Sequence, residues 1–137
     1  MDDHPGVKSG TETILVVEDE SFVRQLMERV LLRFGYQVIL AEDGQDAVEK
    51  YKTHRHSIRL VLMDMIMPRM NGKEAAEKIR SLAPEAKILF SSGYAAEILQ
   101  NRGGLDEGTE LIMKPVHPME LLRKVREMLD MPAINKP

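Results

Sequence analysis

Residues 60–72 read LVLMDMIMPRMNG, and this segment gives the clearest indication of the fold. It begins with four consecutive apolar residues, which are followed directly by the acidic residue Asp64. A short apolar run without alternation is typical of a strand that is buried on both of its faces. Four further runs are similarly short and largely apolar, and they lie at residues 14–17, 36–40, 88–90 and 111–113. We therefore predict five short, buried strands.

Segments with a helical spacing of apolar residues separate these runs. The first ends at Gly35, a residue type that commonly terminates helices, and the second begins at Asp43, a favoured N-cap residue. The third stops before Pro84, the fourth is short (about 94–102), and the fifth carries Pro118 in its first turn.

Strands that alternate with helices predict an α/β fold, in which helices cover both faces of a parallel sheet. The commonest order for a small doubly wound, flavodoxin-like sheet of five strands is 2-1-3-4-5. Its ligand crevice lies between the first and third strands, at their carboxyl ends. We predict this sheet with five helices for residues 12–131, and flexible tails at 1–11 and 132–137.

Composition narrows the classes of function. The chain has 137 residues, a formal net charge of −3 and no cysteine, which excludes disulfide scaffolds, thiolate nucleophiles and cysteine-ligated metals. The absence of a basic run argues against nucleic-acid binding. No apolar run is long enough to span a bilayer, and the first ten residues lack the apolar core of a signal peptide. We therefore expect a cytoplasmic location and no membrane contact.

Acidic residues follow two of the predicted strands at the crevice. Glu18, Asp19 and Glu20 leave the first strand, and Asp64 leaves the third. Carboxylates that lie close together raise one another's pKa unless a cation joins them. A small set of hard oxygen ligands with room for water suits Mg²⁺, or Mn²⁺ in its place. Glu20 taken alone fits a solvated loop residue better than a ligand.

A hydroxyl and an ammonium group end two other strands. The fourth strand ends in Ser91-Ser92-Gly93, and the fifth ends in Lys114-Pro115. Beside an acidic metal site these groups suit a phosphoryl group, because cations neutralise its oxygens in the transition state and a carboxylate can accept it. Each residue alone fits a turn or surface position, but their shared place at strand ends argues for a site. The sharp turn after the lysine predicts a cis Lys114–Pro115 bond.

Four stretches resemble the receiver domain of two-component response regulators: ILVVEDE at 14–20, LVLMDMIMPRMNG at 60–72, ILFSSGY at 88–94 and LIMKP at 111–115. They occur in the order and spacing of that family, and the resemblance covers nearly all of residues 12–131. The resemblance implies that Glu18, Asp19 and Asp64 hold Mg²⁺. The backbone carbonyl of Ile66 would be a further ligand.

The same resemblance implies a signalling switch and not an enzyme in the ordinary sense. Asp64 would accept a phosphoryl group from a phosphohistidine on a sensor histidine kinase or a histidine phosphotransfer protein, and phosphorylation and slow hydrolysis would be self-catalysed. Ser92 would be the switch hydroxyl, and Lys114 would contact the phosphoryl group. The change would spread over residues 88–113. The resemblance also allows a weak dimer through residues 94–113 and the fifth helix.

A finer resemblance concerns the parent protein. SSGYAAE at 91–97 and LIMKPVHPMELLRKVREML at 111–129 are most like the receivers of hybrid sensor histidine kinases, and a parent of that kind would be a histidine kinase. A stand-alone single-domain response regulator is the alternative. One departure from the family is Leu111, where the family usually has Tyr or Phe three residues before the lysine. Rotation of a ring therefore cannot report phosphorylation here.

Three rival functions fit the residues less well. An aspartyl-phosphate phosphatase of the haloacid-dehalogenase type needs a second acid two residues after its nucleophile, where this chain has Ile66. A flavodoxin-like nucleotide or flavin binder needs a Gly- or Ser/Thr-rich loop after the first strand, where Glu18 and Asp19 would repel phosphate. A pseudo-receiver that serves only in protein interaction would not need every phosphorylation residue.

Overall fold

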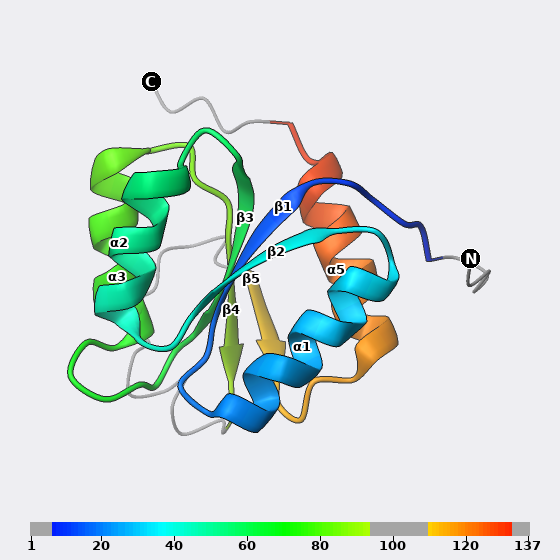
Figure 1. Ribbon diagram of the computed structural model, residues 1–137, viewed down its shortest axis with the longest axis horizontal. Coiled ribbons are helices and arrows are strands. Elements are labelled where there is room, and N and C mark those ends of the chain that lie inside the picture. Colours follow the sequence, from blue (N-terminus) through cyan, green and yellow to red (C-terminus); the bar gives the residue numbers. More distant parts are fainter. Residues whose placement is uncertain (1–6, 94–109, 133–137) are drawn as a thin grey trace.

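A computed structural model describes residues 7–93 and 110–132 of the chain. Its elements are β1 (Thr13–Val17), α1 (Ser21–Arg33), β2 (Gln37–Ala41), α2 (Gly44–His54), β3 (Ile58–Asp64), α3 (Gly72–Leu82), β4 (Ile88–Ser92), β5 (Glu110–Met113) and α5 (Pro118–Asp130). The strands form one parallel sheet in the order β2-β1-β3-β4-β5, which confirms the predicted α/β fold (Figure 1). The helix predicted at about 94–102 lies outside the described residues.

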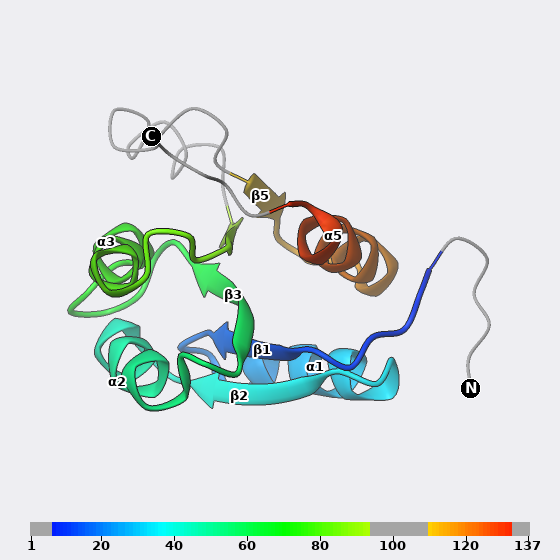
Figure 2. The same ribbon diagram turned by 90° about the horizontal axis from the view of Figure 1, so that it is seen from above.

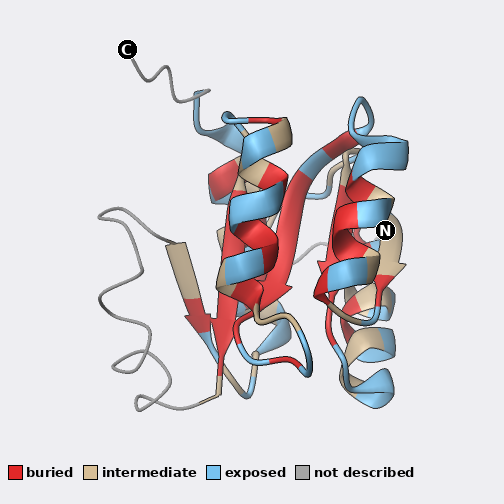
Figure 3. Cartoon of the chain, turned by 90° about the vertical axis from the view of Figure 1, so that its left-hand side faces the viewer, coloured by how far each residue is buried: buried red, intermediate tan, exposed pale blue. Residues whose placement is uncertain are grey.

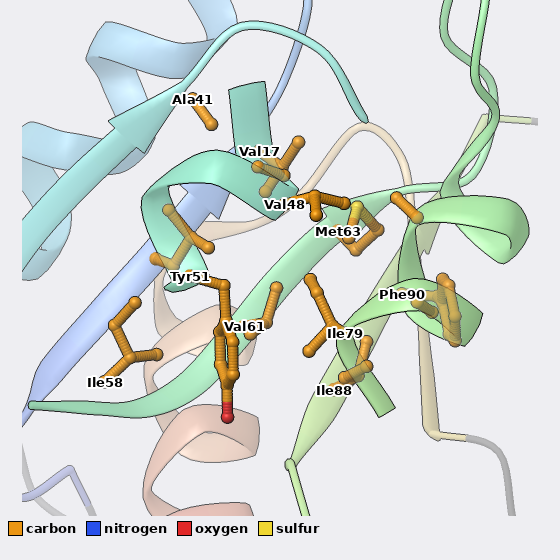
Figure 4. Close-up of a cluster of buried hydrophobic side chains, with 14 of the residues drawn as sticks. Val17, Ala41, Val48, Tyr51, Ile58, Val61, Met63, Ile79, Ile88 and Phe90 are labelled. Atoms are coloured by element: carbon orange, nitrogen blue, oxygen red, sulfur yellow. The ribbon is translucent and has the colours of Figure 1, made fainter. Parts of the chain in front are cut away.

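Helices cover both faces of the sheet. α1 and α5 lie on one face, and α2 and α3 lie on the other (Figure 2). Neighbouring residues of β1 therefore point into different cores: Ile14 and Val16 pack beneath α1 and α5, whereas Leu15 and Val17 pack beneath α2 and α3. The central strands are buried along most of their length (Figure 3), and Figure 4 shows the core beneath α2 and α3. Burial on both faces explains why these strands appear in the sequence as continuous apolar runs.

Local signals in the sequence set the ends of the helices. Gly35 (φ +95°) ends α1 in the left-handed region, where a Cβ would also collide with the carbonyl oxygen of Gly10. Asp43 caps α2 with its carboxylate, which accepts a hydrogen bond of 2.8 Å from the backbone N–H three residues further on. Asn71 begins a capping box at the start of α3, and Pro118 lies in the first turn of α5.

Some strand bounds differ from those predicted. β2 begins at Gln37, one residue late, because the N–H of Tyr36 donates a hydrogen bond of 3.2 Å to Leu31 O and so completes the end of α1. β3 begins earlier than predicted, at Ile58, because that residue still pairs with Thr13 of β1. No helix within the described ranges is long and apolar enough to cross a membrane.

The segment before β1 is tied to α5 by four polar side chains, which we call the Arg126 cluster (Glu12, Tyr36, Arg126 and Asp130). Arg126 Nη2 lies 2.7 Å from Glu12 Oε2 and 2.9 Å from Asp130 Oδ1. Arg126 Nη1 donates a hydrogen bond of 3.3 Å to the hydroxyl of Tyr36. Just before this cluster, within the predicted N-terminal tail, the N–H of Gly10 donates a hydrogen bond of 3.0 Å to a carbonyl at the end of α1.

Candidate functional site

The carboxyl ends of the parallel strands bring four charged residues to one edge of the sheet, where the arrowheads lie in Figure 1. Glu18 and Asp19 follow β1, Asp64 is the last residue of β3, and Lys114 follows β5. Carboxylate oxygens of Glu18, Asp19 and Asp64 all lie within 4.8 Å of one another. We call Glu18, Asp19, Asp64 and Lys114 the acidic site. The sheet order thus brings together the residues that the sequence pattern singled out.

Lys114 makes direct ion pairs inside the acidic site. Its Nζ lies 2.9 Å from Glu18 Oε1 and 3.2 Å from Asp64 Oδ1. Burial lowers the pKa of Lys114, but the two carboxylates more than offset this, so that the pKa is raised above its ordinary value. Because its pKa is raised, the lysine stays charged and serves as the protein's own counter-ion at this edge. The Lys114–Pro115 peptide bond is cis, as predicted.

The protein environment raises the pKa of the Asp64 carboxyl group. Burial is the largest cause, and the nearby Glu18 carboxylate adds to it, while Lys114 acts in the opposite direction; together they raise the pKa of Asp64 to about 7. One ammonium group thus does not balance the buried carboxylates. A bound cation would favour the charged form of Asp64 and relieve the repulsion.

Glu18 is held at both its backbone and its side chain. Its N–H donates a hydrogen bond of 3.1 Å to Ala41 O, and its Oε2 accepts one of 3.1 Å from Glu20 N–H. Its Oε1 is fully buried and faces the Lys114 ammonium group at 2.9 Å. A buried acceptor of this kind, beside two further carboxylates, fits a hard divalent cation.

The remaining predicted residues border the acidic site. Ser92 ends β4 and is fully buried, and its carbonyl accepts a hydrogen bond of 2.7 Å from Lys114 N–H. Ile66 lies two residues after Asp64; its N–H is 3.4 Å from Asp64 Oδ1, and its side chain is 44% exposed. Glu20 is exposed and its carboxylate does not cap α1. Leu111 is half-buried and packs against the core beneath α2 and α3.

Reasoning from the sequence placed Gly72 in the loop after Asp64 without giving it a role, and it did not identify Arg24. Gly72 begins α3 so close to β3 that a Cβ there would collide with the carbonyl oxygen of Asp64. Arg24, on the first turn of α1, donates a hydrogen bond of 2.7 Å from Nη1 to Glu18 O. The Asn71-Gly72 pair is a visible turn signal, whereas no sequence spacing indicates which carbonyl an arginine will reach.

Comparisons with known proteins show which family the chain is similar to. The family model of the response regulator receiver domain matches residues 14–126. The chain is 36% identical to the chemotaxis protein CheY of Treponema pallidum over 117 residues, which are 85% of this chain and 81% of that protein. It is 34% identical to the sensor kinase CckA of Brucella abortus over 122 residues, which are 89% of this chain but 13% of that protein.

A solved structure supports the same relationship. The receiver domain of the hybrid histidine kinase CckA superposes with a TM-score of 0.74 at 31% identity, covering 86% of this chain and 99% of that one. This likeness supports the resemblance to receivers of hybrid kinases. The chain therefore belongs to the response regulator receiver domain family, whose members are the signalling switches of two-component systems.

Proposed function

We propose that this receiver domain accepts a phosphoryl group on Asp64 from a phosphohistidine, in a reaction that depends on Mg²⁺. The observation that carries the proposal is the convergence of three carboxylates within 4.8 Å, two of them buried, with a lysine in contact with both buried ones. A structural role alone does not explain why so many acids lie together beside a single counter-ion, because this arrangement costs folding free energy.

Glu18, Asp19 and Asp64 would hold the cation, together with the backbone carbonyl of Ile66; Mn²⁺ offers the same preference for oxygen ligands. When bound, Mg²⁺ neutralises oxygens of the phosphoryl group. A carboxylate oxygen of Asp64 forms the new P–O bond while the P–N bond of the donor histidine breaks. The electron pair of that bond goes to the imidazole nitrogen, which takes up a proton from solvent.

Two further side chains would act on the phosphoryl group. Lys114 is held at the site by ion pairs with Glu18 and Asp64, so its ammonium group is in place to pair with a phosphoryl oxygen. Ser92 would donate its hydroxyl to another oxygen and carry the change along residues 88–113, as the resemblance implies. With Leu111 in place of a ring, backbone movement or another side chain would report the change.

The direct test is phosphorylation by a small phosphodonor such as acetyl phosphate, followed by intact-protein mass spectrometry. We expect one phosphoryl group per chain with Mg²⁺ and none with EDTA. The Asp64→Asn variant should incorporate none under either condition, while Asp46→Asn, at an acid outside the site, should behave as the wild type. Unchanged incorporation in Asp64→Asn would contradict the assignment.

The proposal also covers the parent protein of this domain and the partner that donates the phosphoryl group. Similarity to the CckA receiver supports a role as the receiver module of a hybrid sensor histidine kinase, with a histidine kinase or phosphotransfer protein as donor. Similarity to the shorter CheY supports the alternative of a stand-alone response regulator. Reading the genomic frame upstream of Met1 separates the two, because a hybrid kinase would encode its kinase module in the same frame.

A further inference from the structure

Arg24 reaches back from the first turn of α1 to the connection that carries two acids of the acidic site. Its Nη1 donates a hydrogen bond of 2.7 Å to Glu18 O and lies 3.5 Å from Asp19 O. Arg24 is half-buried, whereas Arg29, one turn and a half further along α1, is exposed. One side chain thus contacts the backbone of Glu18 and of Asp19, the two acids of this connection that belong to the acidic site.

Backbone hydrogen bonds hold other parts of this connection. The pairing of β1 with β2 ends at Val17, so that residues 18–20 lie beyond the regular ladder. Glu18 N–H donates to β2, Glu18 Oε2 accepts from Glu20 N–H, and Glu20 O accepts a hydrogen bond of 2.9 Å from the backbone N–H of Arg24. The side chain of Arg24 adds a tie from the helix to the carbonyls of Glu18 and Asp19.

We propose that Arg24 is a positioning residue for the metal site, which holds the backbone of Glu18 and Asp19 so that their carboxylates converge with Asp64. This inference rests on the proposed function. Arg24 would act only through the backbone of Glu18 and Asp19, neither binding the metal itself nor contacting the phosphoryl group. Residues that orient metal ligands in this way affect metal affinity by roughly 10- to 100-fold in other proteins.

The sign of the effect separates positioning from simple electrostatics. The positive charge of Arg24 repels a metal ion bound nearby. If this repulsion were its only effect, removing the Arg24 charge would strengthen Mg²⁺ binding. If Arg24 positions the ligands, its removal weakens Mg²⁺ binding in spite of the lost repulsion. The two explanations thus predict opposite changes for the same variant.

The experiment measures Mg²⁺ affinity by isothermal titration calorimetry for the wild type, Arg24→Met, Arg24→Lys and the control Arg29→Met. We expect Arg24→Met to bind Mg²⁺ about tenfold more weakly. Arg24→Lys keeps the charge and one donor, so its affinity should lie between the two. Arg29→Met removes a charge from the same helix and should match the wild type. Urea unfolding in EDTA establishes that each variant is folded.

A metal-free measurement completes the test. In EDTA, hydrogen exchange at the amides of Glu18 and Glu20 should be faster in Arg24→Met than in the wild type, because both amides depend on the geometry of this connection. Unchanged or tighter Mg²⁺ binding in Arg24→Met, or unchanged exchange at these amides, would overturn the proposal. If the wild type does not bind Mg²⁺, that result would instead overturn the proposed function.

Discussion

The acidic site and the Arg126 cluster use the same chemistry at opposite edges of the sheet and reach opposite electrostatic states. In the Arg126 cluster, a hydrogen bond from Arg126 lowers the pKa of Glu12 to about 2. In the acidic site, burial and the neighbouring Glu18 raise the pKa of Asp64 to about 7. Each site joins carboxylates to one basic side chain, so the residue types alone do not explain the difference.

Exposure and balance of charge account for the contrast. The Glu12 side chain is 28% exposed and meets a guanidinium with two donors, while the Asp64 side chain is 4% exposed and shares one ammonium group with Glu18. The first arrangement is complete as it stands and ties the segment before β1 to α5. The second is incomplete without a further cation, as expected of a site that binds one. Unbalanced buried charge, more than the presence of an ion pair, thus distinguishes the acidic site from the Arg126 cluster.

The largest expected difference between the two regions comes from removing each basic side chain. Lys114→Met leaves two buried carboxylates without a counter-ion and should lower the free energy of unfolding by about 3 kcal/mol at pH 8 in EDTA. Arg126→Met should cost only about 1 kcal/mol, because water can reach Glu12 and Asp130. Urea unfolding measures both. An equal loss of unfolding free energy in the two variants would contradict the contrast between the acidic site and the Arg126 cluster.

The next effect is the pH dependence that Asp64 contributes. Its pKa is raised from 3.8 to about 7 in the folded chain, so its contribution to stability is complete below pH 4 and is lost as the pH rises through 7. In EDTA, Asp64→Asn should therefore stabilise the chain by about 2 kcal/mol at pH 8 and by little at pH 4. Urea unfolding at both pH values checks this, and a gain independent of pH would contradict it.

Glu12 should show the opposite dependence with a smaller size. Its pKa is lowered from 4.5 to about 2, so its contribution is present above pH 4.5 and is lost as the pH falls through 2. Glu12→Gln should cost about 1 kcal/mol at pH 6.5 after solvent screening, and less at pH 3. Thermal unfolding at the two pH values provides the measurement, with Glu77→Gln as an exposed control. A cost that grows toward pH 3 would reverse the sign argued here.

The smallest effect is that of salt. At 1 M NaCl the screening length is about 3 Å, so exposed pairs are weakened more than buried ones. The cost of Glu12→Gln at pH 6.5 should fall by about 0.5 kcal/mol, while the cost of Lys114→Met should change by less than about 0.3 kcal/mol. Repeating the unfolding measurements with and without salt tests this. Equal salt sensitivity would mean that burial does not separate the two sites.

Much of the fold could be predicted because burial on two faces leaves a simple signal in the sequence. The run at residues 60–63 is apolar because Leu60 and Leu62 enter one core while Val61 and Met63 enter the other. The bounds of the strands could not all be predicted from the sequence. Whether Tyr36 ends a helix or starts a strand depends on its hydrogen bond to Leu31. The helix predicted near 94–102 and the predicted tail boundaries stay predictions.

The order of elements, the sheet order and the set of residues at the carboxyl edge could all be predicted from the sequence. This was possible because strand polarity in a parallel sheet places every residue that follows a strand at the same edge. The strength and sign of the interactions there became clear from the packed fold. The raised pKa of Asp64 and the ion pair between Glu12 and Arg126, which are 114 residues apart, depend on burial and distance. These quantities arise from packing between segments that are remote in the chain, and no local pattern encodes them.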